Sequence, residues 1–112
     1  MQLEGNKKMS SDNTEAVSVV SIEVSDANDT IVNGTYTNTE EDATGKAAMY
    51  YCPASDRMIK HDGTKWMIEY VGGRIIYYAT ADADNPWEVP TGSWYATEFS
   101  SNDSYIKFTP NY

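Results

Sequence analysis

The segment RMIKHDGTKWMIEYVGGRIIYYAT, residues 57–80, decides the fold class of this 112-residue chain. Three runs of β-branched and aromatic residues follow one another, and turn-forming residues separate them. Asp62–Gly63 is a strong signal for a hairpin turn between the first two runs, and Gly72–Gly73 ends the second run. The segment therefore predicts consecutive antiparallel strands.

The middle strand of this segment predicts which face of the sheet meets the core. Residues of a strand point alternately to its two sides, so Trp66, Ile68 and Tyr70 share one face. The opposite face carries Lys65, Met67 and Glu69. We expect the first face to form the core.

Short strands and polar turns continue on both sides of this segment. Upstream, the run AVSVVSIEVS at 16–25 changes the parity of its apolar residues, which predicts a bulge at Val19–Val20. Further strand-like runs are IVNGTYT at 31–37, AAMYYC at 47–52, GSWYAT at 92–97 and YIKF at 105–108. Helical signals are weak, because Gly45 interrupts the acidic stretch TEEDATGKAAMYY. We therefore predict an all-β fold, a small antiparallel sheet that is sandwich-like or barrel-like.

The sequence NGTY at 33–36 predicts the start of a strand. Gly34 gives the backbone the freedom that a strand-entry turn needs. We expect Tyr36 to face the core and the acidic residues at 40–42 to form a solvated loop. This stretch is therefore interpreted as scaffold and not as a reactive site.

The chain divides into an N-terminal arm and one domain. Residues 1–15 are mostly polar, and their large apolar residues are too few to offset the entropy of ordering by burial. We predict that residues 1–15 form a flexible arm. Residues 16–112 are predicted to form a single β-domain, which is large enough for one hydrophobic core.

Composition and charge argue against several classes of partner. The 17 acidic and 8 basic residues give a formal net charge of −9, which repels nucleic-acid phosphates and anionic membranes. The N-terminal sequence lacks the apolar core of a signal peptide, and no run approaches the length of a membrane helix. We expect a soluble protein that is synthesised in a cytoplasm and binds neither nucleic acid nor membranes.

No arrangement of residues predicts catalysis or a cofactor. His61 is the only histidine in the sequence, and its place beside the predicted turn favours a solvated residue over a catalytic base. Cys52 is the only cysteine, and its β-rich surroundings favour a small buried apolar residue over a reactive thiol. One histidine and one cysteine do not supply the ligands of a usual zinc site. We predict a non-enzymatic protein with no catalytic, cofactor-binding or metal-binding residues.

The stretch ADADNP raises the alternative of a calcium site, because Asp82, Asp84 and Asn85 carry suitable oxygen atoms. The calcium loop of an EF-hand, however, needs Gly and Glu where this chain has Trp87 and Ser93. We interpret the stretch as a polar turn.

The chain is rich in aromatic residues: nine Tyr, three Trp and two Phe make up 12% of it. Most are expected in the core and in cross-strand pairs, but alternation leaves some outside. Tyr95 faces outward if Trp94 faces inward, and Tyr105 faces outward if Ile106 and Phe108 face inward. Outward tyrosines suit contacts with proteins or stacking against sugars.

Six short motifs follow one another between residues 32 and 95, within a stretch of about 20–96 that makes up most of the chain. They are VNGTYT at 32–37, MYY at 49–51, DGTKWMI at 62–68, IIYYAT at 75–80, NPWEVP at 85–90 and SWY at 93–95. This ordered series resembles a small β-module of bacteriophage structural proteins and of large repeat-bearing surface proteins of microbes. The resemblance implies a non-catalytic display or assembly unit and carries over no functional residues.

These observations lead to one main hypothesis of function. We expect a structural accessory protein of a virion, such as a capsid decoration or cement subunit or a fibre or tail component. Its partners are then other virion proteins or further copies of itself, and an arm that orders on a neighbour fits this role. The candidate contact residues are Leu3, Lys7, Lys8 and Met9 on the arm and Trp87, Tyr95 and Tyr105 on the domain.

Two alternatives belong to other classes. An acidic inhibitor that mimics nucleic acid needs its carboxylates along one face, whereas the sequence scatters them over 26–29, 40–42 and 82–84. A carbohydrate-binding or adhesion module needs a shallow aromatic platform, for which Trp87 and Tyr95 are the candidates.

Overall fold

The computed structural model describes residues 19–40 and 43–112, and it confirms the predicted all-β fold. The strands are β1 (Ser21–Ser25), β2 (Gly34–Asn38), β3 (Tyr50–Cys52), β4 (Arg57–His61), β5 (Trp66–Tyr70), β6 (Ile75–Ala79), β7 (Trp94–Ala96), β8 (Ser101–Asp103) and β9 (Lys107–Asn111). The helical segments in these residues are short 3-10 turns: η2 (Thr30–Val32), η3 (Gly45–Ala47) and η4 (Pro86–Glu88). Within the described ranges, no helix has the length and apolar character that crossing a membrane requires.

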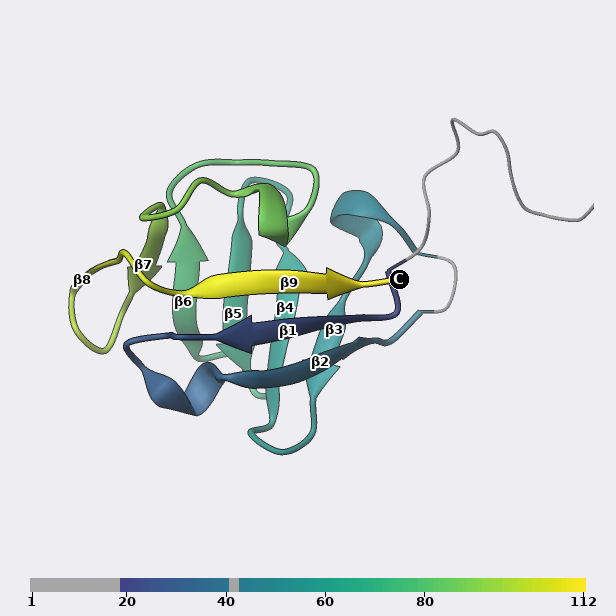
Figure 1. The fold of residues 1–112 in the computed structure, drawn as a ribbon, viewed down its shortest axis with the longest axis horizontal. Coiled ribbons are helices and arrows are strands. Elements are labelled where there is room, and N and C mark those ends of the chain that lie inside the picture. Colours follow the sequence, from purple (N-terminus) through teal and green to yellow (C-terminus); the bar gives the residue numbers. More distant parts are fainter. Residues whose placement is uncertain (1–18, 41–42) are drawn as a thin grey trace, which may run out of the picture.

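The strands form one antiparallel sheet in the order β8-β7-β6-β5-β4-β3-β2-β1-β9. Strands β1 to β8 therefore pair in chain order, as consecutive hairpins do. Strand β9 departs from this order, because it returns to pair with β1 and brings Asn111 opposite Ser21. The sheet curls into a half-barrel, and in Figure 1 β9 and β1 cross over β3, β4, β5 and β6.

The core lies inside this curl. Trp94 of β7 and Phe108 of β9 stack with their ring centroids 4.6 Å apart, although the two strands are not neighbours in the sheet. The other large buried side chains include Ile22, Val24, Val32, Tyr36, Tyr50, Ile59, Trp66, Ile68 and Tyr77. Removing this much apolar surface from water is the main source of stability in a domain of this size.

The predicted hairpin at Asp62–Gly63 is confirmed. Strands β4 and β5 pair from Arg57↔Tyr70 to His61↔Trp66, and Asp62 closes the four-residue loop between them. Its carboxylate accepts hydrogen bonds from the backbone N–H groups of Thr64 and Lys65, both at 2.9 Å. These bonds hold the pKa of Asp62 well below its usual range, so the loop keeps an ionised side chain.

The predicted inward face of β5 is confirmed for Trp66 and Ile68, which are fully buried. Tyr70 is 39% exposed, because it ends the strand and its ring lies under the Arg57 guanidinium, 4.5 Å from its centroid. On the opposite face Met67 is also buried, at 5% exposure. It lies between its cross-strand neighbours Lys60 and Tyr78, so the outer side of the sheet has buried apolar surface of its own.

The strand start predicted at NGTY and the inward position of Tyr36 are confirmed. Gly34 begins β2 with φ +149°, a conformation that side chains rarely adopt. Tyr36 is fully buried, and its hydroxyl donates to the Val32 carbonyl at 2.7 Å. A Cβ atom at Gly34 would lie 3.2 Å from the Sγ atom of Cys52, which is buried as predicted.

The bulge was expected within a strand at Val19–Val20, but these two residues precede β1, which begins at Ser21. Val19 is buried and Val20 is exposed, and the pairing of β1 with β2 and β9 then runs without interruption. The register shift that the structure does contain lies between β5 and β6, where Ile68 and Glu69 pair with Tyr77 and Ile75. The intervening Ile76 is buried beside Tyr77, so β6 sends two consecutive side chains inward.

A buried carboxylate joins the end of β8 to the segment after β1. Asp103 is fully buried and accepts hydrogen bonds from the Tyr77 hydroxyl and from three backbone N–H groups, at 2.7 to 3.0 Å. The three backbone donors are Asn28, Tyr105 and Ile106. Burial alone raises the pKa of Asp103, but these four donors outweigh it and hold the pKa below its ordinary value.

Candidate functional site

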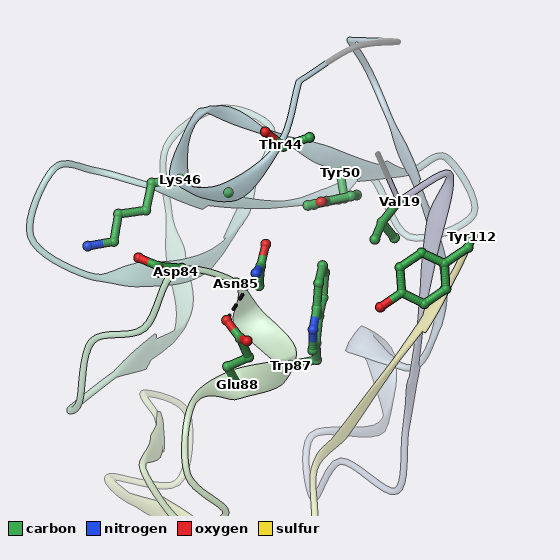
Figure 2. A pocket seen from close by; sticks show the side chains of 10 residues that line it. Val19, Thr44, Lys46, Tyr50, Asp84, Asn85, Trp87, Glu88 and Tyr112 are labelled. Carbon is green, nitrogen blue, oxygen red and sulfur yellow. Dashed lines mark hydrogen bonds between the residues drawn. The ribbon is translucent and has the colours of Figure 1, made fainter. Parts of the chain in front are cut away.

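A pocket of about 590 Å³ opens where η3, η4 and the C-terminal residue meet. Its walls combine aromatic, carboxylate, amide and ammonium groups, as Figure 2 shows. The lining residues are Val19, Thr44, Gly45, Lys46, Tyr50, Asp84, Asn85, Trp87, Glu88 and Tyr112. Its volume falls within the range of about 300–1,000 Å³ that is usual for small-molecule sites.

The loop before η4 is fixed to the sheet at its start. The indole N–H of the buried Trp66 donates to the Ala83 carbonyl at 2.8 Å, which holds the loop against β5. Pro86 is buried at the first position of η4, where its missing N–H leaves no helical bond unmade. Trp87 follows it and presents a half-buried ring to the pocket.

Asp82 connects this loop with two other parts of the fold. Its Oδ2 atom accepts a hydrogen bond from Lys46 Nζ at 2.9 Å, and its Oδ1 atom lies 2.9 Å from His61 Nε2. The bonds to Lys46 and His61 lower the pKa of Asp82 to about 2. Asp82 is therefore ionised, and its carboxylate pairs within the protein from the polar turn that the sequence favoured.

His61 is not the solvated residue that the sequence predicted. Its side chain is only 3% exposed, and its ring meets the edge of Trp66 with centroids 5.2 Å apart. The Nδ1 atom accepts a hydrogen bond from the Gly63 N–H at 3.0 Å, so in the neutral ring Nε2 carries the proton that Asp82 accepts. The sequence reasoning failed because Asp82 lies 21 residues further along the chain. With both ring nitrogens engaged, His61 stabilises the loop.

The pocket retains polar groups that the protein does not use. Tyr50 is only 1% exposed as a whole, but its hydroxyl is open to the pocket and forms no hydrogen bond with the described residues. Burial raises its pKa, so the hydroxyl keeps its proton at neutral pH. The Asp84 carboxylate is exposed and forms no ion pair within the described ranges. Glu88 accepts one hydrogen bond, from the Asn85 amide at 3.0 Å.

These groups can bind a ligand, but they do not form a metal centre. In residues 19–40 and 43–112, no group of three or more His, Cys, Asp or Glu side chains is arranged to hold a metal ion. Asp82, Asp84 and Asn85 also do not act together, because Asp82 is held by Lys46 and His61. The chemistry that the pocket offers is hydrogen bonding beside an aromatic face.

The structure separates the candidate contact residues of the domain. Trp87 lies in η4 and lines the pocket, whereas Tyr95 lies in β7 and pairs with Asn102 of β8 and Tyr78 of β6. Tyr105 is 69% exposed and lines a second pocket of about 700 Å³, formed by the segments after β1 and β8. The predicted platform of Trp87 and Tyr95 is therefore not a single surface. The four arm candidates lie outside the described residues: Leu3, Lys7, Lys8 and Met9.

Tyr95 belongs instead to an aromatic row on the outer face of the sheet. Trp94 is buried and Tyr95 points outward, as alternation predicted. The rings of Tyr78 and Tyr95 lie 5.0 Å apart, and Met67 pairs with Tyr78 from the next strand. We call Met67, Tyr78 and Tyr95 the outer row; an ion pair between Lys60 and Glu69, at 3.0 Å, lies beside it.

Sequence reasoning missed most of the groups that surround Trp87 in the pocket. Tyr50, Asp84, Glu88 and Tyr112 come from segments far apart in the sequence, and no periodic pattern links them. The available signal was the dense mixture of acidic, amide and aromatic residues at 84–88, next to the candidate Trp87. Comparisons of the chain with models of protein families, with curated proteins and with solved structures found no match.

Proposed function

We propose that this protein is a non-enzymatic structural accessory protein of a virion that acts through protein–protein assembly. The observation that carries the proposal is the outer row of Met67, Tyr78 and Tyr95, which continues across three neighbouring strands. Tyr78 and Tyr95 supply the accessible surface of this row, since Met67 is only 5% exposed. Tyrosine is enriched in protein interfaces, where it buries a large area at low entropic cost. A sheet surface of this kind suits a contact with a neighbouring subunit.

The arrangement of the titratable groups supports a role without catalysis. His61 has both nitrogens engaged, Cys52 is buried against Gly34, and Asp103 is saturated with hydrogen-bond donors. In these three environments the side chain serves the fold. The candidate role of the arm, residues 1–15, remains part of the proposal: Leu3 and Met9 enter pockets on a neighbour while Lys7 and Lys8 meet an acidic surface.

The use of the carboxylates argues against the alternative of a nucleic-acid mimic. Asp62, Asp82 and Asp103 bind donors of their own protein, at different places in the fold. Glu69 and Glu98 pair with Lys60 and Arg74, both at 3.0 Å. A mimic instead needs free carboxylates at phosphate-like spacing along one face, so assembly is the function that we adopt.

Mass spectrometry of purified particles tests the proposal directly. Particles are isolated from cells that carry the gene in its viral context, and the chain is expected in stoichiometric amounts. Tyr78→Ser with Tyr95→Ser is expected to abolish incorporation while the isolated protein stays folded by circular dichroism. Ile31→Ser, which changes an exposed apolar residue on η2, is the matched control and leaves incorporation intact. Absence of the wild-type chain from particles contradicts the proposal.

Deletion of residues 1–15 tests the contribution of the arm. The truncated protein is expected to keep the melting transition of the domain and to lose incorporation or self-association. Incorporation at the wild-type level assigns the contact to the domain alone and removes the arm from the proposal.

A further inference from the structure

We propose that the pocket between η3, η4 and Tyr112 binds a neutral pyranose sugar. This inference goes beyond the assembly function and rests on different residues, since the outer row lies on the other side of β5, β6 and β7 from the core. Three features of the pocket carry it: an accessible aromatic face, unused hydrogen-bonding groups around that face, and a charge distribution that selects against anionic ligands.

The aromatic face belongs to Trp87. Figure 2 shows its ring standing in the middle of the pocket, with Asp84, Asn85 and Glu88 on one side and Tyr112 on the other. The position of Trp87 is fixed on its inner side, because it follows the buried Pro86 and packs partly against the core. An aromatic side chain held in one orientation provides contact area without a large loss of entropy, and its face accepts the C–H groups of a sugar ring.

The groups around Trp87 include both donors and acceptors. The Asp84 carboxylate and the free oxygen of Glu88 accept hydrogen bonds, while the Asn85 amide and Lys46 ammonium donate them. Every sugar hydroxyl both donates and accepts, so a mixed set of this kind matches a polyhydroxylated ring. Carboxylate acceptors also form stronger hydrogen bonds than neutral groups do.

The Tyr50 hydroxyl is one more hydrogen-bonding group at the pocket. Tyr50 lines the pocket, and its hydroxyl forms no hydrogen bond with the described residues. Its oxygen is not one of the fully buried unpaired atoms among these residues, so it is open to the pocket. A ligand hydroxyl that reaches the floor of the pocket satisfies this group.

The charges select against an anionic ligand. Asp84 and Glu88 repel anions, in a protein whose formal net charge is already −9. The mixture of donors and acceptors favours a neutral ligand over a simple cation, which would use the acceptors alone. The Lys46 charge is partly compensated by Asp82 at 2.9 Å, so its remaining N–H groups suit a hydroxyl oxygen.

Nuclear magnetic resonance of the full-length protein tests the inference without requiring a variant. The three indole N–H signals provide an internal control, because Trp66 donates to Ala83 and the Trp94 nitrogen is buried, while Trp87 faces the pocket. Glucose, galactose, mannose, N-acetylglucosamine and their short neutral oligomers are titrated to about 10 mM, since single-sugar affinities of about 1 mM are measurable. At least one of them is expected to shift the Trp87 signal and leave the Trp66 and Trp94 signals unchanged.

Two variants assign the binding to the proposed groups. Trp87→Ala is expected to weaken binding of the responding sugar at least tenfold, and Tyr50→Phe, which removes only the hydroxyl, weakens it severalfold. Tyr105→Ala, at the second pocket, is the matched aromatic control and leaves the affinity unchanged. If Trp87→Ala does not fold, Tyr50→Phe and the wild-type titration still decide the question.

Several outcomes overturn the inference. They are the absence of any shift at the highest sugar concentration, equal binding by Trp87→Ala, and tighter binding of tetramethylammonium or glucuronate than of every neutral sugar. The incorporation of Trp87→Ala into particles is measured as well. Because the sugar site and the outer row use different residues, a failure of sugar binding and a failure of assembly can then be told apart.

Discussion

Asp103 shows how one side chain connects distant parts of this chain. Its carboxylate accepts four hydrogen bonds in a fully buried position, including one from a backbone group 75 residues away. An asparagine amide keeps one acceptor oxygen and places an N–H₂ group against the donors. We expect Asp103→Asn to lower the free energy of unfolding by about 3 kcal/mol, because buried donors lose their partner.

Chemical denaturation at neutral pH measures this effect, with Tyr77→Phe as control. The control removes one of the four donors and is expected to cost about 1 kcal/mol. The lowered pKa of Asp103 means that its contribution is present above the ordinary carboxyl pKa of about 3.9 and is lost as the pH falls through the folded-state pKa. An Asp103→Asn protein as stable as the wild type at pH 7 contradicts the role assigned to the carboxylate.

Two features of position 34 favour glycine: its backbone angle and the nearby side chain of Cys52. Its φ of +149° is unfavourable for alanine, and a Cβ atom would lie 3.2 Å from Cys52 Sγ. We expect Gly34→Ala to destabilise the fold by about 1–3 kcal/mol, measured by denaturant unfolding. Gly72→Ala, at φ +133° with nothing within 4 Å of the new Cβ, is the control for the backbone alone. A Gly34→Ala protein no less stable than Gly72→Ala contradicts the steric contribution of Cys52.

At the scale of single residues, local chemistry could be predicted and distant partners could not. The freedom of Gly34, the inward Tyr36 and the buried Cys52 follow from the residue types and their immediate neighbours. The burial of His61 and the role of Asp103 depend on partners 21 and 75 residues away. A sequence pattern carries no information about such contacts until the fold brings the residues together.

At the scale of elements, the segment from Asp82 to η4 is fixed by side chains rather than by regular structure. Asp82 joins it to η3 through Lys46 and to β4 through His61. Because its pKa is lowered to about 2, the stabilisation is complete above the ordinary value of about 3.9 and is lost as the pH falls toward 2. Acid is therefore expected to release this segment.

We expect Asp82→Asn to lower Tm at pH 7, because the amide no longer pairs with Lys46. The difference in Tm from the wild type is expected to shrink from pH 5 downward and to vanish near pH 2, where the wild-type carboxyl is protonated. Thermal melts monitored by circular dichroism across this range measure both trends. Asp84→Asn, which removes a carboxylate that forms no ion pair with residues 19–40 or 43–112, is the control. A Tm difference that stays constant with pH contradicts the assignment.

Hairpins were the elements that the sequence predicted best. The turn at Asp62–Gly63 is stabilised by neighbouring residues alone, since the Asp62 carboxylate accepts hydrogen bonds from backbone N–H groups of the same loop. The pocket could be predicted only in part, through Trp87. Its other walls come from η3, β3 and the C-terminal residue, and the sequence does not indicate that these lie beside η4. The register shift beside Ile76 could not be predicted. The run IIYY at 75–78 places apolar or aromatic residues on both faces of the strand, so it does not indicate where the alternation breaks.

At the scale of the whole molecule, the all-β class followed from the repeated alternation of strands and turns. The curl of the sheet did not follow, because the direction in which β9 returns is set by long-range packing. The stack of Trp94 on Phe108 joins β7 to β9 across the curl, and both residues were expected inward without being expected to meet. The pattern of strands and turns thus indicates the class of this fold, whereas the contact between Trp94 and Phe108 belongs to the long-range packing that sets its curl.

The return of β9 to β1 also determines how fast the chain can fold. Neighbouring strands from β1 to β8 are joined by connections of at most 14 residues, the longest being 80–93 between β6 and β7, whereas β1 and β9 meet across about 90 residues, as the bond between Asn111 and Ser21 indicates. Closing so long a loop has an entropic cost that must be met before the contact forms, and long-range contacts slow folding. Docking of β9 is therefore expected as the slow step.

A circular permutant tests this consequence. Val20 and Asn111 are already bonded through their backbones at 2.9 Å, so a short glycine linker can join Tyr112 to Val19. Opening the chain between Ser104 and Tyr105 then gives the order β9, β1 and onward to β8, in which every pair of neighbouring strands is consecutive. Stopped-flow refolding monitored by tryptophan fluorescence is expected to be at least severalfold faster than in residues 19–112 of the original order. An equal or slower rate places the kinetic barrier within the hairpins.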